Sequence, residues 1–382
     1  MTMSSRSPLF TTASLPLTID LVAAARPNFM KIAPLWHALS HEPWARVRII
    51  HTGQHYDATM SEVFFQDLGM PKPYLNLGIG GGTHGQQTGR VLEAYEGHLM
   101  KERPDLVIVV GDVNATPAAA LAAVKLQIPV AHLEAGLRSF DRTMPEEINR
   151  RITDSICDIL WTPSEDADEH LQTEGIPNER RLRVGNIMID TLCLLLPRIK
   201  ADPILHTLSL QEGSYVVVTL HRPANVDNRE QLALLCKKLV ACSKTIPLVL
   251  PLHPRTRARL TEFGLLSLLE HEAPHLRLLT PQPYCAFMRL VQGSLTVLTD
   301  SGGVQEETSY LGIPCLTLRE NTERPVTITL GTNRLITADD LPKALEEAIQ
   351  KAHTPASIPL WDGQTAGRIV EHIRTLFGIG LQ

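Results

Sequence analysis

Short, strongly apolar segments alternate with helix-compatible segments along nearly the whole of this 382-residue chain. The segment from Leu106 to Val110 consists only of aliphatic residues, which is typical of a strand buried on both faces of a parallel sheet. Parallel neighbours require a crossover connection, usually a helix, so the alternation predicts repeated βα units. The pattern therefore restricts the chain to the α/β class with mainly parallel sheets.

The predicted elements fall into two groups, separated by a segment of weak periodicity at 201–213. In the first group, strands are predicted at 17–24, 45–52, 105–111, 129–133, 158–162 and 181–184, with helices near 28–40, 58–68, 84–102, 114–126, 145–156 and 165–174. After a helix near 187–200, the second group has strands at 215–220, 248–252, 276–279, 296–299 and 315–318, and a last helix is expected at 363–377. We expect two doubly wound, Rossmann-like domains facing a cleft, with ligands at the carboxyl ends of the strands.

The composition is typical of a soluble globular protein, with 43% hydrophobic and 20% charged residues. A formal net charge of −5 gives no general reason to expect nucleic-acid binding. Six cysteines without a CxxC pair indicate reduced thiols and disfavour metal ligation through them. No apolar run reaches the roughly 18 residues of a membrane-spanning helix, and we interpret the first 15 residues as a tail rather than a signal peptide.

The segment 296–307 joins an apolar, strand-like run directly to a helix through Asp300, Ser301, Gly302 and Gly303. Such a turn directs backbone N–H groups and the positive end of a helix dipole at one point, which suits a phosphate group. Two glycines allow the backbone to approach a ligand closely. The alternative is that Ser301 is an ordinary N-cap and that the glycines form only a tight turn.

The loop after the first predicted strand is not glycine-rich, so a nicotinamide cofactor is disfavoured there. Arg26 and Lys31 follow this strand and are candidates to bind a diphosphate, Arg26 with more reason because a guanidinium binds oxygens bidentately. Lys31 has the alternative of a solvated helix residue. A GxGxxG match at 80–85 is interpreted as a mobile loop before a helix start, since Thr83 and Gln86 fit a capping box.

Three carboxylates are expected to converge in the first domain. Asp112 and Glu134 each end a buried strand, and Glu146 is the first of two glutamates at a helix start. Mutual repulsion and partial burial in such a group raise pKa values into a range useful for proton transfer. Each residue also has a structural alternative: Asp112 as a helix cap, Glu134 paired with Arg138, and Glu146 in a capping box with Thr143.

In the second group, His221 and Arg222 follow the first strand. A histidine beside a diphosphate stabilises it as a leaving group, although a structural histidine at a domain edge is the alternative. His253 follows another strand in a similar way and has a weaker case.

Further polar residues are expected on the same side as Ser301. Arg319 follows another strand, and Glu323 and Arg324 lie just beyond it. Glu307 is a candidate acceptor for a ribose diol, although Glu306 is an equally charged neighbour.

Taken together, the ordered motifs resemble the UDP-N-acetylglucosamine 2-epimerases of the glycosyltransferase-B-like superfamily, from about residue 17 to the C-terminus. The segments that carry the resemblance are 26–31 (RPNFMK), 52–55 (TGQH), 110–112 (VGD), 132–138 (HLEAGLR), 144–150 (MPEEINR), 184–186 (VGN), 220–222 (LHR), 300–307 (DSGGVQEE) and 321–325 (NTERP). Their number and their order, rather than any single motif, make the resemblance specific.

The resemblance implies catalytic roles for Asp112, Glu134, Glu146 and His221. It implies that the UDP-sugar is bound by Arg26, Lys31, Gln282, Phe287, Ser301, Gly302, Gly303, Glu307 and Arg319. It further implies a cytoplasmic homodimer that works without NAD or a metal, and the composition predicts neither a nucleic-acid nor a membrane partner. The final helix is implied to return to the first domain, so we expect a tail at 1–15 and domains at 16–188 with 363–382 and at 189–362.

The implied reaction is the reversible C2 epimerisation of UDP-GlcNAc to UDP-ManNAc through a 2-acetamidoglucal intermediate. Loss of UDP from C1 acidifies the C2 hydrogen, which a carboxylate then removes. One alternative is a hydrolysing 2-epimerase, and another is a 2-epimerase of a modified UDP-sugar such as a uronic acid or a 2,3-diacetamido derivative. More distant alternatives are a glycosyltransferase and a non-catalytic sugar-nucleotide sensor.

Three departures from the commonest bacterial pattern bear on regulation and substrate. Gln54 and His55 form the candidate regulatory site, but residues 56–57 (Tyr-Asp) follow where many members have Arg-Glu-Met, so activation by a second UDP-GlcNAc is not implied. The first loop carries Asn28 where glutamate is usual, and Val326 stands where glutamate often follows the Arg-Pro pair. These changes leave room for a modified sugar.

Overall fold

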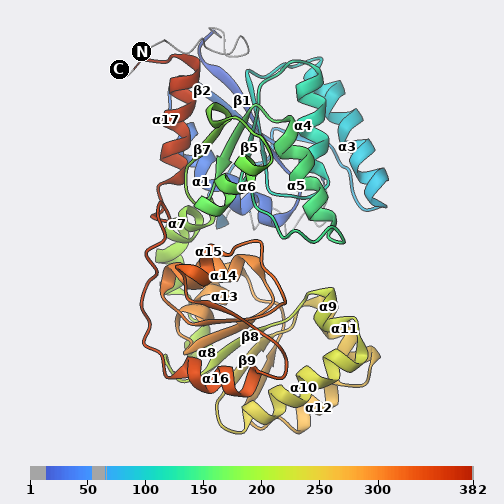
Figure 1. Ribbon diagram of the computed structural model, residues 1–382, viewed down its shortest axis with the longest axis vertical. Helices are drawn as coiled ribbons and strands as arrows, with labels where there is room; N and C mark the ends of the chain where they lie inside the picture. Colours follow the sequence, from blue (N-terminus) through green and yellow to red (C-terminus); the bar gives the residue numbers. More distant parts are fainter. Residues whose placement is uncertain (1–13, 54–64, 66, 381–382) are drawn as a thin grey trace. The chain divides into compact units, whose positions relative to one another are not determined.

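The computed structural model describes residues 14–53, 65 and 67–380, and the chain divides into two compact units. Unit 1 comprises residues 1–194 and 359–382, and unit 2 comprises residues 195–358. Each unit is built on one fully parallel sheet flanked by helices (Figure 1). The predicted fold class, α/β with two doubly wound sheets, is confirmed.

Unit 1 has a seven-stranded sheet with the order β3-β2-β1-β4-β5-β6-β7. Its strands are β1 (Leu17–Ala23), β2 (Ala45–His51), β3 (Leu75–Asn76), β4 (Leu106–Val110), β5 (Val130–Leu133), β6 (Ile159–Thr162) and β7 (Arg181–Arg183). Its helices are α1 (Arg26–Ser40), α3 (His84–Leu99), α4 (Ala115–Lys125), α5 (Pro145–Ile156), α6 (Glu165–Thr173), the 3-10 turn η2 (Asn178–Arg180) and α17 (Thr365–Phe377). The five residues of β4 are all buried, as their aliphatic sequence predicts.

The last helix, α17, is part of unit 1 and packs against α1 (Figure 1). The buried carboxylate of Asp190 accepts hydrogen bonds from the N–H groups of Thr365 (3.1 Å) and Ala366 (2.8 Å). Asp190 lies on α7 (Ile187–Ala201), whose residues 195–201 belong to unit 2. An aspartate from a distant helix therefore caps the positive end of α17.

Unit 2 has a six-stranded sheet with the order β10-β9-β8-β11-β12-β13. Its strands are β8 (Val216–Thr219), β9 (Leu248–Pro251), β10 (Leu276–Leu279), β11 (Thr296–Thr299), β12 (Cys315–Leu318) and β13 (Asn333–Ile336). Its helices are α8 (Ile204–Thr207), α9 (Pro223–Val226), α10 (Arg229–Ser243), α11 (Pro254–Glu262), α12 (Leu266–His271), α13 (Tyr284–Gln292), α14 (Gly302–Leu311), α15 (Val326–Thr329) and α16 (Leu341–Ile349). Aliphatic side chains of β8, β9 and α10 form much of its core.

Every predicted strand occurs within one residue of its predicted ends, and the capping box of Thr83 and Gln86 at the start of α3 is confirmed. Two strands were not predicted. β3 has only two residues, and β13 begins with Asn333, whose buried side chain accepts a hydrogen bond from Thr317 at 2.6 Å. The helix predicted near 58–68 falls largely on residues outside the described part of the chain, and the segment 201–213 contains the short helix α8.

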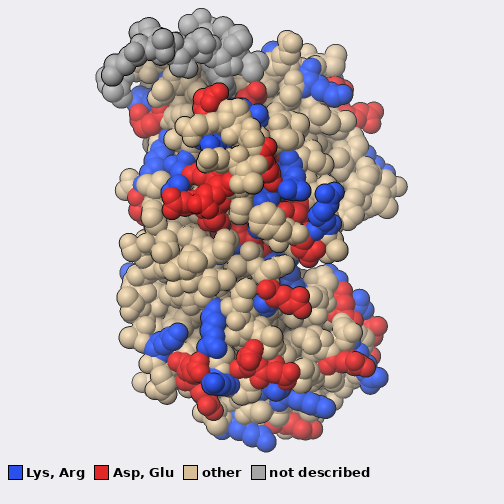
Figure 2. All heavy atoms as spheres, in the orientation of Figure 1, with Lys and Arg blue, Asp and Glu red and all other residues tan. Residues whose placement is uncertain are grey.

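Within the described part of the chain, every helix is too short or too polar to cross a bilayer. On the face of the protein shown in Figure 2, basic and acidic side chains lie beside one another in both units. This mixing agrees with the small net charge of the sequence.

Candidate active site

Each sheet has one point at which the strand order reverses, between β1 and β4 in unit 1 and between β8 and β11 in unit 2. Open α/β sheets bind ligands outside the carboxyl ends of the strands at such a point. The predicted residues Lys31 and Asp112 follow β1 and β4, and His221 and Ser301 follow β8 and β11. Most of the sequence-predicted residues therefore lie next to one of the two reversal points.

Asn28 joins the loops that follow β1 and β4. Its Oδ1 accepts hydrogen bonds from the N–H groups of residues 24–25 at 3.3 and 3.0 Å, and its Nδ2 donates to the carbonyl of Val110 at 3.1 Å. Gly111 follows with a φ of +68°, and a Cβ there would lie 3.2 Å from both Asn28 Nδ2 and Lys31 Nζ. The left-handed backbone therefore favours glycine at this position, and a Cβ would force the Asn28 and Lys31 side chains to shift.

Lys31 and Glu134 form a buried ion pair between Nζ and Oε2. The alternative of a solvated Lys31 is wrong, since the residue is only 9% exposed. Glu134 has a φ of +72°, a left-handed conformation that is uncommon outside glycine. Its N–H donates to the carbonyl of Trp161 at 3.1 Å, so neighbouring strands hold this conformation.

Asp112 is bound by α5. Nε and Nη2 of Arg150 donate to its Oδ2 at 3.0 and 2.8 Å, and Nδ2 of Asn149 donates to its carbonyl at 2.9 Å. The N-cap residue of α4 is Asn114, so the alternative of Asp112 as the helix cap is wrong. The guanidinium of Arg150 favours the ionised form of Asp112.

The two adjacent glutamates of α5 have different surroundings. Glu147 is buried and accepts hydrogen bonds from Arg150 Nη1 (2.9 Å), from the N–H and Oγ of Ser139 (2.9 and 3.0 Å) and from the N–H of Phe140 (3.3 Å). Glu146 is only half-buried. Glu147 therefore stabilises the loop before α5, whereas Glu146 is the more exposed of the two glutamates.

The capping box predicted for Glu146 is wrong. The N-cap of α5 is Met144, and the hydroxyl of Thr143 donates instead to Asp141 at 2.7 Å. This outcome removes the structural alternative for Glu146.

His132, Asp154 and Arg138 form a group of buried charged or titratable residues next to the loop that contains Gly111. Nδ1 of His132 is 2.6 Å from Oδ1 of Asp154, and its Nε2 is 2.9 Å from the carbonyl oxygen of Gly111. Arg138 pairs with Asp154 at 2.7 Å and with Glu174 at 2.7 Å, so the predicted alternative in which it pairs with Glu134 is wrong. Although burial acts to raise the pKa of Asp154, His132 and Arg138 hold it below its ordinary value.

In unit 2, His221 is held by a buried aspartate at the end of β11. Nδ1 of His221 lies 2.9 Å from Oδ1 of Asp300. Asp300 also accepts hydrogen bonds from the N–H of Arg222 (2.9 Å) and from Nδ2 of Asn225 (3.1 Å). Burial acts to raise the pKa of Asp300, but the hydrogen bond and charge of His221 keep it below its ordinary value. His253, in contrast, caps α11 through Nδ1, which is a structural role.

Ser301 occupies the N-cap position of α14, and its N–H donates to Oγ1 of Thr299 at 3.0 Å. Among the described residues, its hydroxyl makes no capping hydrogen bond. The alternative of an ordinary side-chain cap is therefore wrong. The hydroxyl and the first N–H groups of α14 are suited to bind an anion.

Three arginines lie around the carboxylate of Glu323 near the N-terminus of α14. This carboxylate is buried and lies 2.7 Å from Arg319 Nη2, 2.5 Å from Arg324 Nη1 and 3.6 Å from Arg222 Nη2. Arg324 also pairs with Glu306 at 2.7 Å. The cluster carries three positive and two negative charges, so it can supply guanidinium groups to a phosphate without unbalanced repulsion.

Glu307 differs from its neighbour Glu306. Its Oε1 accepts a hydrogen bond from the hydroxyl of Tyr284 at 2.6 Å, and the side chain is buried. Burial raises the pKa of Glu307 to about 7, an effect only partly offset by Tyr284 and increased by Glu306. Because Glu306 is already paired with an arginine, Glu307 is the better candidate to bind a ligand hydroxyl.

Gln282, Phe287 and Arg26 are half-buried or exposed. Nε2 of Gln282 donates to the carbonyl of Thr280 at 2.8 Å, and Phe287 is half-buried on α13. Arg26 is the first residue of α1 and is exposed. Gln54 and His55, the candidate regulatory site, lie outside the described residues.

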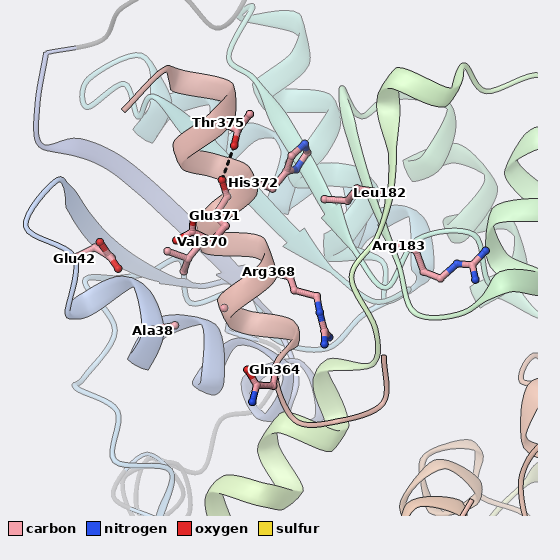
Figure 3. Close-up of a pocket in the computed structure, with 11 residues that line it drawn as sticks. Ala38, Glu42, Leu182, Arg183, Gln364, Arg368, Val370, Glu371, His372 and Thr375 are labelled. Atoms are coloured by element: carbon pink, nitrogen blue, oxygen red, sulfur yellow. Dashed lines mark hydrogen bonds between the residues drawn. The ribbon is translucent and has the colours of Figure 1, made fainter. Parts of the chain in front are cut away.

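A pocket of about 700 Å³ is lined by residues of α1, β7 and α17, and it contains none of the predicted site residues (Figure 3). His372 lines it and accepts a hydrogen bond from Nε1 of Trp161 at 2.9 Å. Burial lowers the pKa of His372, which agrees with a neutral ring in this place.

Sequence reasoning did not assign roles to Glu147, Arg150 or Asp300. Arg150 and Glu147 stand in the segment 144–150, and Asp300 directly precedes Ser301. A charged residue immediately after a predicted buried strand was a usable signal for Asp300. For Arg150 there was no such signal, because its partner Asp112 is 38 positions away.

Comparison with known proteins supports one family. A family model described as UDP-N-acetylglucosamine 2-epimerase matches residues 37–374. A UDP-N-acetylglucosamine 2-epimerase of Methanocaldococcus jannaschii is 41% identical over 93% of this chain and 98% of its own. A UDP-2,3-diacetamido-2,3-dideoxy-D-glucuronate 2-epimerase of Pseudomonas aeruginosa is also 41% identical, over 94% of this chain and 100% of its own.

A solved structure agrees with this assignment. The crystal structure of Methanocaldococcus jannaschii UDP-GlcNAc 2-epimerase in complex with UDP-GlcNAc and UDP has a TM-score of 0.86 and 40% identity, and the match covers 94% of this chain and 100% of that one.

Two Rossmann-like units, each with charged and polar residues at its reversal point, define the glycosyltransferase-B-like fold class. The chain belongs to the UDP-N-acetylglucosamine 2-epimerase family, and it is an epimerase, that is, an isomerase. The predictions of family, fold class and enzyme class from the sequence motifs are confirmed.

Proposed function

We propose that the protein interconverts UDP-GlcNAc and UDP-ManNAc by reversible epimerisation at C2, without net hydrolysis. The observation that carries the proposal is that the two reversal points have different kinds of functional groups. Unit 1 has buried or half-buried carboxylates with fixed cationic partners, and unit 2 has a histidine and a helix N-terminus suited to a diphosphate.

The proposed reaction sets the requirements for these groups. C2 of a 2-acetamido sugar has no neighbouring carbonyl in the ring, so its hydrogen is not acidic. When the C1–O bond breaks, the electron pair leaves with UDP, a carboxylate takes the C2 proton, and a C1–C2 double bond forms. UDP then adds back to C1 while an acid delivers a proton to the opposite face of C2. The enzyme therefore needs two proton-transfer groups and a bound diphosphate.

In unit 1, we assign proton transfer to Asp112, Glu134 and Glu146. Asp112 is paired with Arg150, and Glu134 is paired with Lys31. Glu146 is half-buried and has no structural cap to form, which leaves it able to act as the second proton-transfer group.

In unit 2, we assign UDP binding to the loop and helix that follow β11 and to nearby side chains. Ser301, Gly302 and Gly303 supply an N-terminal anion site, and Glu307 accepts hydrogen bonds from ribose hydroxyls. His221 stabilises the departing diphosphate. Gln282, Phe287 and Arg319 complete the proposed set of binding residues in unit 2, and Arg26 and Lys31 are the proposed binding residues of unit 1.

A second candidate is the 2-epimerisation of a UDP-2,3-diacetamido uronate. The identity of 41% to the Pseudomonas aeruginosa enzyme equals that to the Methanocaldococcus jannaschii enzyme. Asn28 also favours it, because a neutral amide stands beside Lys31 where the common family pattern has a carboxylate that would repel an anionic sugar.

Proton NMR in heavy water tests the proposal with both substrates. We expect deuterium at C2 and the appearance of UDP-ManNAc when UDP-GlcNAc is supplied. Exchange only with the diacetamido uronate would select the second candidate, and release of free ManNAc with UDP would identify a hydrolysing enzyme. Absence of C2 exchange with every 2-acetamido UDP-sugar, despite binding, would contradict all of these epimerase assignments.

We further propose, from the family resemblance, that the enzyme is a cytoplasmic homodimer that needs neither NAD nor a metal. Light scattering during size-exclusion chromatography tests the dimer, and unchanged turnover after dialysis against a chelator tests metal independence.

A further inference from the structure

Asp300 is surrounded by hydrogen-bond donors. Its carboxylate is fully buried and accepts from Nδ1 of His221 (2.9 Å), the N–H of His221 (3.0 and 3.1 Å to its two oxygens), the N–H of Arg222 (2.9 Å) and Nδ2 of Asn225 (3.1 Å). Of these, only the contact with His221 Nδ1 goes to Oδ1 alone. The backbone donors cannot reverse their role, so the carboxylate has a fixed orientation.

This geometry determines which ring nitrogen of His221 carries a hydrogen. An ionised carboxylate is only an acceptor, so Nδ1 must be the donor, and Nε2 is the nitrogen left for a ligand. The His221 side chain is 35% exposed, in contrast to the buried carboxylate. The ring of His253 lies 5.4 Å away, and its own Nδ1 accepts the N–H of Arg255 at 3.2 Å, so it does not compete for Asp300.

We propose that Asp300 is a positioning residue that fixes the Nδ1–H form of His221 and stabilises its imidazolium, so that Nε2–H donates a hydrogen bond to the diphosphate oxygen as the C1–O bond breaks. The first part concerns the free protein, and the last step rests on the proposed function. Asp300 does not need to take up a proton, since the carboxylate acts only through charge and hydrogen bonding.

The substitution Asp300→Asn tests this role, because the hydrogen-bond donors around residue 300 determine how the new amide group is oriented. The new amide has one oxygen and one NH₂ group, so its NH₂ group must take the place of either Oδ1 or Oδ2 of the aspartate. The Oδ2 side faces three donors and the Oδ1 side mainly His221, so the NH₂ group is expected to face His221 Nδ1. That nitrogen must then accept, which moves the neutral hydrogen to Nε2.

Nitrogen NMR of protein with ¹⁵N-labelled histidine rings reads the tautomer directly. For the neutral His221 ring of the free wild-type protein, we expect a protonated Nδ1 and an unprotonated Nε2. In Asp300→Asn we expect the reverse, with assignment from the signal lost in His221→Gln. A wild-type His221 that is protonated on Nε2 alone would overturn the proposal, whether or not the variant folds and whether or not the enzyme epimerises this substrate.

Turnover provides the second readout. Asp300→Asn removes the negative charge that stabilises the imidazolium of His221. Loss of one group that stabilises a developing oxyanion typically lowers kcat by about 10²–10³-fold, so we expect a loss of at least about 10²-fold in kcat with a smaller change in KM. In a His221→Gln background, Asp300→Asn should cause little further loss, because both changes remove one interaction. Fully additive losses would assign Asp300 a purely structural role.

Asp190→Asn is a matched control. Asp190 is also a buried aspartate that accepts two backbone N–H groups, but it lies in unit 1 and contacts no histidine in the described structure. We expect it to lower the melting temperature while leaving the His221 tautomer and kcat unchanged. An equal loss of kcat in Asp190→Asn would overturn the specific role of Asp300.

Discussion

At the scale of single residues, Glu134 combines an unusual backbone conformation with a buried charge. Its φ of +72° and its ion pair with Lys31 are both unfavourable unless the surrounding structure enforces them. Such a combination is more common at functional sites than elsewhere in a fold. We infer that the side chain is held ready for proton transfer.

Glu134→Gln should therefore abolish C2 exchange, with a loss of at least about 10²-fold, because the amide cannot act as a base. UDP affinity should change much less, since most of the proposed nucleotide-binding residues are in unit 2. Heavy-water NMR and calorimetric titration of UDP measure the two effects. Glu174→Gln, which removes a different carboxylate paired with an arginine, is the control and should leave exchange intact. A parallel loss of UDP binding in Glu134→Gln would assign the residue to folding or binding.

Glu307 makes stability depend on pH. Its pKa is raised to about 7 from an ordinary value of 4.5, so the folded state retains a proton that the unfolded state releases. The free energy of unfolding should consequently fall as pH rises from about 4.5 to about 7, by as much as about 3 kcal/mol from this group.

Glu307→Gln should remove this part of the pH dependence and stabilise the free protein at pH 8 relative to the wild type. Thermal melting between pH 5 and pH 8, compared with Glu306→Gln, measures the effect. Glu306 is paired with Arg324, so its substitution is expected to destabilise the protein at neutral pH. Identical pH profiles for Glu307→Gln and the wild type would contradict the assignment.

At the scale of elements, the N-terminus of α14 depends on a close approach to the Glu323 cluster. A Cβ at Gly302 would lie 2.7 Å from Arg324 Nη1 and 2.8 Å from Glu323 Oε1, whereas a Cβ at Gly303 would meet nothing within 4 Å. Packing therefore accounts for a glycine at position 302 but not at position 303.

Gly302→Ala should displace the Arg324–Glu323 pair, lowering stability by about 1–3 kcal/mol and weakening UDP binding. Gly303→Ala is the matched control for stability and should be neutral or slightly stabilising, because alanine favours a helix. Urea unfolding of the two variants tests this difference. Equal stabilities would show that the cluster adapts without cost.

Secondary-structure elements were predicted correctly where the local sequence alone determines them. β4 and β11 are short apolar runs bounded by polar residues, and such runs are recognisable without tertiary information. β13 was missed because it begins with the polar Asn333, whose burial depends on hydrogen bonds to Thr317, Gln305 and Thr327 elsewhere in the chain. The capping box considered for Glu146 does not form for a related reason, because the Thr143 hydroxyl donates to Asp141 instead.

At the scale of the whole molecule, the proposed function assigns UDP to unit 2 and proton transfer to unit 1. Hydrogen-exchange mass spectrometry can separate these parts. UDP alone should protect the amides of 301–307, and a UDP-sugar should additionally protect the segments that contain Asp112 and Glu134. Protection of unit 1 alone by UDP would contradict the division of roles.

The sequence by itself determined the α/β class, all strands except β3 and β13, the family, and the strand ends at which most of the candidate residues lie. These depend on apolar periodicity and on residues that are close in the chain. Only the tertiary structure decided how those residues are paired: Lys31 with Glu134, Asp112 with Arg150, and His221 with Asp300. Each of these pairs joins residues far apart in the chain, and their charge states depend on burial and on neighbours that no local pattern specifies.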